Sequence, residues 1–167
     1  MTSAVLEEAL KKAALAWVSV GDAPAVGVWC LPLDGSLIVV TGPGEQFAPD
    51  LALASRATVR LRGDNGGLIV IAEMTATRLT PGSEDWNTAA PQLAQKRLNA
   101  SGTADEVVAR WARTGCAVVR LTPEQDKTAP DLPADSGAAT PRPTPARKET
   151  RRPFRLHRVR GSKTRGS

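Results

Sequence analysis

The chain has 167 residues, which is enough for one domain with a substantial core but too little for two ordinary domains and a linker. Its formal net charge of +5 is unevenly distributed: residues 1–121 hold 11 basic and 12 acidic residues, whereas residues 122–167 hold 11 basic and 5 acidic residues. The sequence therefore predicts a near-neutral domain over 1–121, followed by a basic, proline-rich and disordered tail over 122–167.

Two membrane-related classes of protein are excluded by what the sequence lacks. No window approaches about 18 consecutive apolar residues, so we expect no transmembrane helix and no membrane partner. Glu7 and Glu8 lie in the first apolar stretch, which argues against a signal peptide. A cytoplasmic location is therefore the expectation.

The side chains that usually carry chemistry are scarce in residues 1–121. The single histidine, His157, lies in the tail, so the domain has no base for a Ser-His-Asp or Cys-His mechanism and no histidine ligand for a metal. Cys30 and Cys116 are too few for a disulfide framework and too far apart in sequence for a zinc knuckle, so we expect two buried thiols. We assign no catalytic residue and no metal ligand, and any chemistry is expected to come from a bound cofactor.

Hydrophobic periodicity divides the first 121 residues into helices and strands. Apolar residues recur at helical spacing over 3–15 and predict an N-terminal helix. Alternating or β-branched segments predict six strands, at residues 17–20, 25–31, 36–41, 58–62, 68–79 and 116–121. Turn sequences join 25–31 to 36–41, and a glycine-rich loop at 63–67 joins 58–62 to 68–79, so these four strands form two hairpins.

Three further helical segments are indicated by capping residues and prolines. Residues 49–55 predict a short helix with a proline at its start. Ser83 caps a helical region that Pro91 divides or kinks. Thr103 and Glu106 form a capping box, and Gly115 ends that helix. Because the strands are joined as antiparallel hairpins, the order of elements favours a small barrel, mainly β with flanking helices, over a doubly wound sheet.

The sequence resembles a known family in several segments. The strand end Thr41-Gly42, the short helix at 48–55 and the strand Thr58-Val59-Arg60-Leu61-Arg62 are similar to the FMN-binding split β-barrel of the pyridoxamine 5′-phosphate oxidase-like family. Trp86 after Pro81-Gly82-Ser83, Lys96-Arg97-Leu98-Asn99 and Arg110-Trp111-Ala112-Arg113 resemble actinobacterial members, so the match covers residues 1–121.

The resemblance implies both an architecture and a function. It implies a six-stranded antiparallel split barrel of Greek-key-like order, a homodimer, and FMN or the deazaflavin F420 held in a cleft between subunits. Some relatives oxidise pyridoxamine phosphate, some reduce substrates with F420, and others have no assigned reaction. An FMN- or F420-dependent oxidoreductase is therefore the expected function.

One segment departs from the family pattern. In the family, basic residues between the third strand and the short helix often grip the cofactor phosphate, because Arg and Lys make charge-assisted contacts to a dianion. Here these positions are Glu45, Gln46 and Phe47. A carboxylate beside a phosphate is repulsive by about 1 kcal/mol or more at partly buried range, which argues against ordinary FMN binding there.

Seven residues are candidates for cofactor binding. Arg60 and Arg62 share one face of a strand, about 7 Å apart by the strand rise, and are either phosphate ligands or a solvated face. The turn after the strand at 36–41 either offers backbone N–H groups, a hydroxyl and an amide to a phosphate or a flavin edge, or is a plain strand-to-helix turn with an exposed Gln46. Arg56 precedes the strand at 58–62 and reaches either the same cleft or only the C-terminus of the short helix. The full set is Thr41, Gly42, Gly44, Gln46, Arg56, Arg60 and Arg62.

Four other side chains have a functional and a structural interpretation. Trp29 and Trp86 could stack on a ring system, although packing in the core or in a dimer interface is the default expectation. Lys96 and Arg97 form a basic pair, for which surface or interface contacts are the default.

Two alternative functions stay open. The first is a non-catalytic split-barrel dimer or ligand-binding module, whose cofactor site has degenerated around Glu45. The second is a nucleic-acid-associated protein that acts through its basic tail, although Phe154 alone could stack on a base and a merely solubilising tail is the simpler interpretation. The basic residues concerned are Arg151, Arg152, Arg155, Arg158, Arg160, Lys163 and Arg165.

Overall fold

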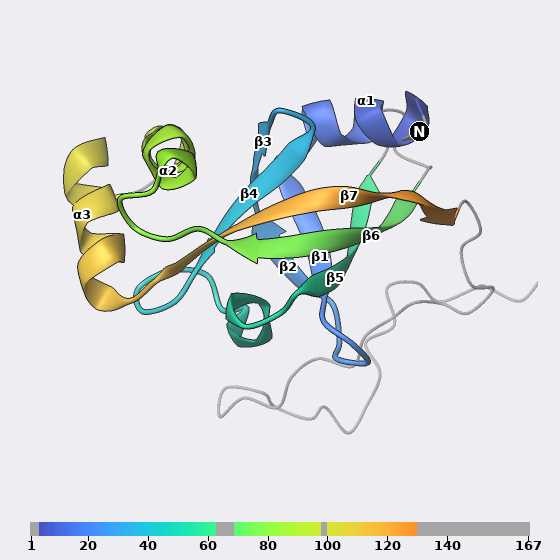
Figure 1. Cartoon of the computed structure of the whole chain (residues 1–167), viewed down its shortest axis with the longest axis horizontal. Coiled ribbons are helices and arrows are strands. Elements are labelled where there is room, and N and C mark those ends of the chain that lie inside the picture. Colours follow the sequence, from blue (N-terminus) through green and yellow to red (C-terminus); the bar gives the residue numbers. More distant parts are fainter. Residues whose placement is uncertain (1–3, 63–68, 98–99, 130–167) are drawn as a thin grey trace, which may run out of the picture. The chain divides into compact units, whose positions relative to one another are not determined.

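The computed structural model describes residues 4–62, 69–97 and 100–129 (Figure 1). The loop expected at 63–67 and the part of the expected disordered tail beyond residue 129 lie outside the described residues. The described helices and strands follow in the order α1 (Ala4–Lys12), β1 (Leu15–Ser19), β2 (Val26–Trp29), β3 (Leu31–Leu33), β4 (Ser36–Thr41), the 3₁₀ helix η1 (Pro49–Ala52), β5 (Arg56–Arg62), β6 (Ile69–Arg78), α2 (Glu84–Lys96), α3 (Ala104–Thr114) and β7 (Ala117–Ala129).

The strands form one antiparallel sheet that curls into a nearly closed barrel with a seam. Their order across the sheet is β2-β1-β5-β6-β7-β4-β3, and every pairing is antiparallel. The predicted fold class, mainly β with flanking helices in a split barrel, is confirmed. The described sheet has seven strands instead of the six that we expected.

The additional strand arises because the segment predicted as one strand at 25–31 is divided at Cys30. Its first part, β2, pairs with β1, whereas its second part, β3, pairs with β4. The two parts lie at opposite edges of the sheet, and the N–H of Cys30 between them donates to the carbonyl of Ala14 (3.1 Å). The predicted hairpin of 25–31 with 36–41 is therefore wrong for residues 26–29 and correct for residues 31–33.

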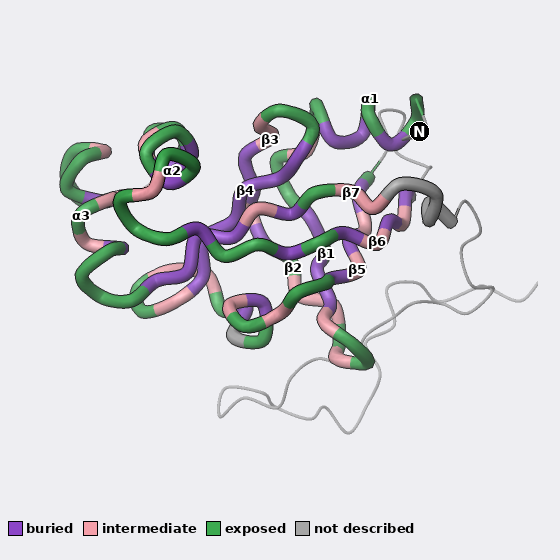
Figure 2. The backbone as a smooth tube through the Cα atoms, in the orientation of Figure 1, coloured by how far each residue is buried: buried purple, intermediate pink, exposed green. Residues whose placement is uncertain are grey.

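Two apolar cores lie on the two sides of this sheet. The first fills the barrel and includes Leu37 and Val59, with Leu6 of α1 and Leu51 of η1 packed against it. The second lies where α2 and α3 cover the outer side of β4 and its neighbours (Figure 1). Strand β4 contributes to both cores in alternation, since it is buried along its whole length (Figure 2).

The helices agree closely with their sequence signals. Thr103 and Glu106 form the predicted reciprocal capping box of α3, and Gly115 ends that helix with a φ of 74°. Ser83 caps α2 as expected, and of the two alternatives for this region the structure has a single helix, with Pro91 inside it. Helix η1 is shorter than the predicted segment 49–55.

The last strand is longer than the sequence indicated. We expected it at 116–121, but β7 continues to Ala129 and pairs with β6 beyond a register shift between Ala72 and Met74. Residues 122–129, which we expected to be the disordered start of the tail, are therefore in a strand. The division of the chain at 121/122 into a domain and a tail remains a prediction.

Gly42 lies close against the backbone of Cys116. Its φ is 142°, and a Cβ there would lie 2.9 Å from the Cα of Cys116. We predict that Gly42→Ala lowers the free energy of unfolding by about 2 to 4 kcal/mol, because strain and a backbone clash add. Gly44→Ala is the matched control: its φ is 76° but no atom lies within 4 Å of the added methyl, so about 1 kcal/mol is expected. Equal losses for both variants in denaturant titrations would contradict this account.

Candidate functional site

The loop between β4 and η1 contains four of the seven predicted site residues, and its polar groups are engaged within the protein. The hydroxyl of Thr41 donates to the carbonyl of Gln46 (2.9 Å) and accepts from the N–H of Ala48 (2.9 Å). The N–H of Gly42 donates to the carbonyl of Gln46 (3.3 Å), and the N–H of Glu45 donates to the carbonyl of Gly42 (3.0 Å). These bonds hold the loop in one tight conformation.

The side chain of Gln46 lies in the seam of the barrel. Continuing the register of β3 with β4 would place Trp29 opposite Val40. Instead, Nε2 of Gln46 donates to the carbonyls of Trp29 (3.1 Å) and Val40 (3.2 Å), and its Oε1 accepts from the N–H of Trp29 (2.5 Å). The amide therefore replaces direct strand pairing where β2 and β4 separate.

The side chain of Glu45, next in sequence, is buried beside the helices. Its carboxylate is 1% exposed and lies 2.9 Å from Nε of Arg97 at the end of α2. From α3, the indole N–H of Trp111 donates to it (2.8 Å), and a guanidinium nitrogen of Arg110 lies 3.7 Å away. The charge that we expected to repel a phosphate is thus paired internally, and it ties the loop to α2 and α3.

The predicted arginines of β5 lie on the outer side of the sheet. Alternation along the strand buries Ala57, Val59 and Leu61 in the barrel and points Arg56, Arg60 and Arg62 outward. The guanidinium of Arg56 is paired with Glu124 of β7 (2.8 Å).

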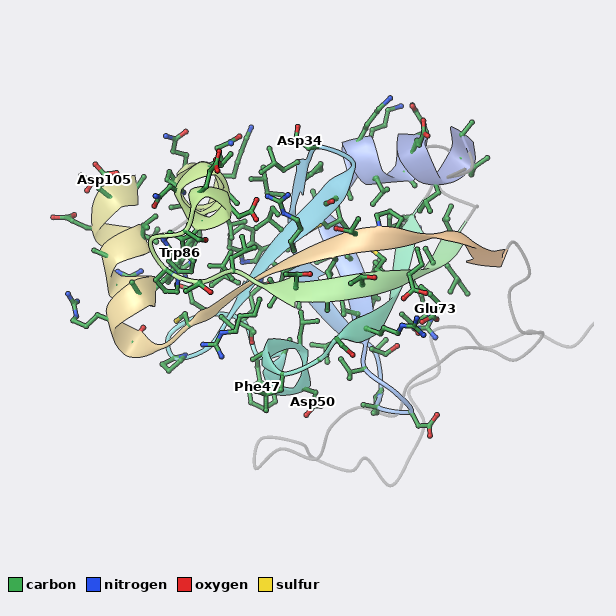
Figure 3. All side chains as sticks on the ribbon, viewed as in Figure 1. Asp34, Phe47, Asp50, Glu73, Trp86 and Asp105 are labelled. Atoms are coloured by element: carbon green, nitrogen blue, oxygen red, sulfur yellow. The ribbon has the colours of Figure 1, made fainter. Side chains whose placement is uncertain are left out.

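Around Arg60 and Arg62 the surface carries a mixture of polar groups. Arg60 donates to the hydroxyl of Ser19 (3.1 Å), and Arg62 is exposed. Glu73 of β6 lies on the same side of the sheet (Figure 3), where its carboxylate accepts from Thr58 (2.6 Å).

Sequence reasoning missed two neighbours of these arginines, Leu15 and Trp17 of β1. Both point outward, with 45% and 39% of their surface exposed, whereas Ala16 and Val18 point into the barrel. Trp17 lies directly opposite Arg60 in the pairing of β1 with β5. The alternation of residues 15–18 was a signal that could have identified this apolar outer surface. Leu15, Trp17, Arg60 and Arg62 are called the outer face below.

The remaining candidates serve mainly in packing. Trp86 is buried between α2 and the sheet (Figure 3), and Trp29 is half-buried against the same core. Of the basic pair, Lys96 is exposed, whereas Arg97 binds Glu45. Phe47, the third residue of the segment that departs from the family pattern, is 64% exposed.

The thiols are buried, as the sequence predicted. Both cysteines are free and buried, and burial raises the pKa of the Cys30 thiol to about 12, which keeps it protonated at neutral pH.

Within the described ranges, no three His, Cys, Asp or Glu side chains gather as a possible metal site. No helix in the described part of the chain combines the length and apolar character that crossing a membrane requires.

Comparison with solved structures finds this fold in proteins of low sequence identity. The heme storage protein HutZ of Vibrio cholerae has a TM-score of 0.51 at 13% identity, over 70% of this chain and 85% of that chain. A FAD-binding protein of Mesorhizobium loti has a TM-score of 0.49 at 16% identity, over 74% and 91% of the two chains. No protein-family model matches the sequence, and no curated protein matches it. The chain therefore has the split-barrel fold of the pyridoxamine 5′-phosphate oxidase-like proteins, as the resemblance predicted.

The two groups of predicted site residues differ in how well they suit a flavin phosphate. The loop contributes no cation of its own, and the Glu45 carboxylate and Gln46 amide are turned to internal partners. The outer face provides two guanidinium groups beside an exposed indole. An anionic flavin therefore fits the outer face better than the loop.

We predict that Gln46 stabilises the fold and does not bind a ligand, and a substitution at this residue tests that role. Gln46→Ala removes three hydrogen bonds and leaves polar groups of Trp29 and Val40 without the amide, so the free energy of unfolding should fall by about 2 to 4 kcal/mol. Gln92→Ala is the control, since that amide makes a single exposed bond to Thr88 and should change stability by less than about 0.5 kcal/mol. Similar midpoints for both variants in guanidinium titrations would show that the seam does not depend on Gln46.

Proposed function

We propose that this protein binds a flavin-type cofactor, FMN or F420, at the outer face and acts as an oxidoreductase. The observation that carries the proposal is the position of Arg60 and Arg62 beside the exposed side chains of β1. Helices α2 and α3 cover the β4 region of the sheet (Figure 1), and the outer face retains exposed apolar surface. Cationic groups next to exposed apolar surface suit a ligand that is both aromatic and anionic.

In this proposal the chain binds and orients its ligand. Arg60 and Arg62 hold the phosphate through charge-assisted hydrogen bonds, and the exposed apolar side chains of Leu15 and Trp17 contact the ring. When bound, the flavin supplies the hydride or electron transfer, so no side chain of this chain need act as nucleophile.

The other predicted site residues act indirectly in this proposal. Thr41, Gly42, Gly44 and Gln46 fix the loop and the seam, and thereby the position of β2 and β1. Arg56 is paired with Glu124 and is not a phosphate ligand in this proposal. A cytoplasmic location is retained as part of the proposal.

The engagement of Glu45 and Gln46 favours a second candidate function. If the loop has lost its role in holding a cofactor, the protein is a non-catalytic split-barrel module of the same fold. The two candidates differ in a simple observable: a module of this kind would bind neither FMN nor F420, or would bind one of them without supporting turnover.

The outer face also supports the expected homodimer, with the ligand in the cleft between two copies. We predict that light scattering gives the mass of two chains of 17.6 kDa, and that Leu15→Lys shifts the population toward one chain, because it places a charge in the interface. Val5→Lys, at a 51% exposed apolar position on α1, should leave the mass unchanged. A wild-type protein that elutes as a single chain at micromolar concentration would contradict the dimer.

The cofactor proposal predicts saturable flavin binding that depends on the two arginines. FMN and F420 should each be titrated into the protein while their fluorescence is followed. The cofactor that binds should do so with micromolar affinity, and Arg60→Ala with Arg62→Ala should raise Kd by about tenfold or more, since a hydrogen bond to a charged group contributes about 1.5 to 3 kcal/mol.

Arg113→Ala is the matched control, because Arg113 is an exposed arginine on α3 and lies outside the outer face. Its affinity should equal that of the wild type. Absence of binding for both flavins, or equal affinities in all three proteins, would overturn the proposal for the outer face.

A further inference from the structure

Trp17 occupies an unusual position on the sheet. It lies opposite Gly27 in the pairing with β2 and opposite Arg60 in the pairing with β5. A Cβ at Gly27 would lie 3.6 Å from Nε1 and 3.9 Å from Cδ1 of the indole. The pyrrole edge of Trp17 therefore lies over Gly27, which has no side chain to lift the ring away from the sheet.

Part of this indole is exposed to solvent. Trp17 stays 39% exposed, whereas Trp86 and Trp111 are 3% and 0% exposed in the second core. Its neighbour Arg60 directs a guanidinium nitrogen to the hydroxyl of Ser19. An indole that lies against Gly27 and stays partly exposed is a suitable surface for stacking of a second aromatic ring.

The arginines lie at a suitable spacing for a ring that carries an anionic chain. Arg60 is the direct cross-strand neighbour of Trp17, and Arg62 is the diagonal neighbour at about 7 to 8 Å. A tricyclic flavin ring on Trp17 would place the phosphate of its five-carbon ribityl chain within reach of these side chains, since both arginines are long and flexible.

We propose that Trp17 is the stacking surface for the flavin ring and that it makes the site specific for a planar aromatic ligand. This inference rests on the proposed function. The inference assigns separate roles within that site: Trp17 recognises the ring and the arginines recognise the phosphate.

Comparison of FMN with riboflavin, which has the same ring without the phosphate, tests this division directly. Trp17→Ala should weaken binding of FMN and of riboflavin by the same factor of about five to a hundred, since stacking of one ring is worth about that much. Trp17→Phe should restore most of the affinity. The Arg60→Ala, Arg62→Ala variant should weaken FMN binding and leave riboflavin binding unchanged.

A spectroscopic readout separates stacking from a merely structural role. Stacking on an indole quenches flavin fluorescence, so bound flavin should be dark in the wild type and brighter in Trp17→Phe at equal saturation. Phe47→Ala is the control, since it removes another exposed aromatic side chain that lies outside the outer face. Thermal unfolding of each variant confirms that the protein is folded.

The outcomes distinguish failure of the proposed cofactor binding from failure of the role of Trp17. If the wild type binds none of FMN, riboflavin and F420, the proposed function fails and the role of Trp17 fails with it. If the wild type binds FMN but Trp17→Ala keeps the wild-type Kd and the wild-type quenching, the role of Trp17 is overturned and the cofactor proposal stands.

Discussion

The amide of Gln46 joins β2 to β4 beside the break at Cys30 that separates β2 from β3. Because β2 and β3 lie at opposite edges of the sheet and a single residue connects them, the barrel cannot close by ordinary pairing of Trp29 with Val40. The side chain of Gln46 supplies the missing hydrogen bonds, and the buried carboxylate of Glu45 ties the same loop to Arg97 and Trp111. Through these bonds the loop connects the barrel to α2 and α3.

These contacts make the loop a poor site for a ligand phosphate. A loop whose hydroxyl, amide and carboxylate all have partners within the protein has little left to offer a phosphate. The second core covers the outer side of the sheet near β4, so we place both the proposed ligand and the proposed partner at the exposed outer face of β1 and β5. Arg60 and Arg62 supply the charge there and Trp17 the ring, which is why the proposed cofactor and the proposed dimer use the same surface.

Local signals in the sequence predicted most of the fold and only part of the site. The capping box at Thr103, the outward alternation of Arg60 and Arg62 and the hairpin of β5 with β6 follow from spacing within a few residues. The break at Cys30 depends on a pairing choice that alternation does not encode. The partners of Gln46 and Glu45 likewise lie in distant segments, so no local pattern could reveal that Glu45 is neutralised by Arg97.

A crystal structure of the protein with FMN tests the central claim most directly. The account predicts density for the phosphate within hydrogen-bond distance of Arg60 or Arg62 and the ring parallel to the indole of Trp17, with the Gln46 amide still bound to Trp29. A phosphate bound by the 41–48 loop, with Glu45 or Gln46 turned away from its present partners, would contradict the account and return the site to the loop that the sequence first suggested.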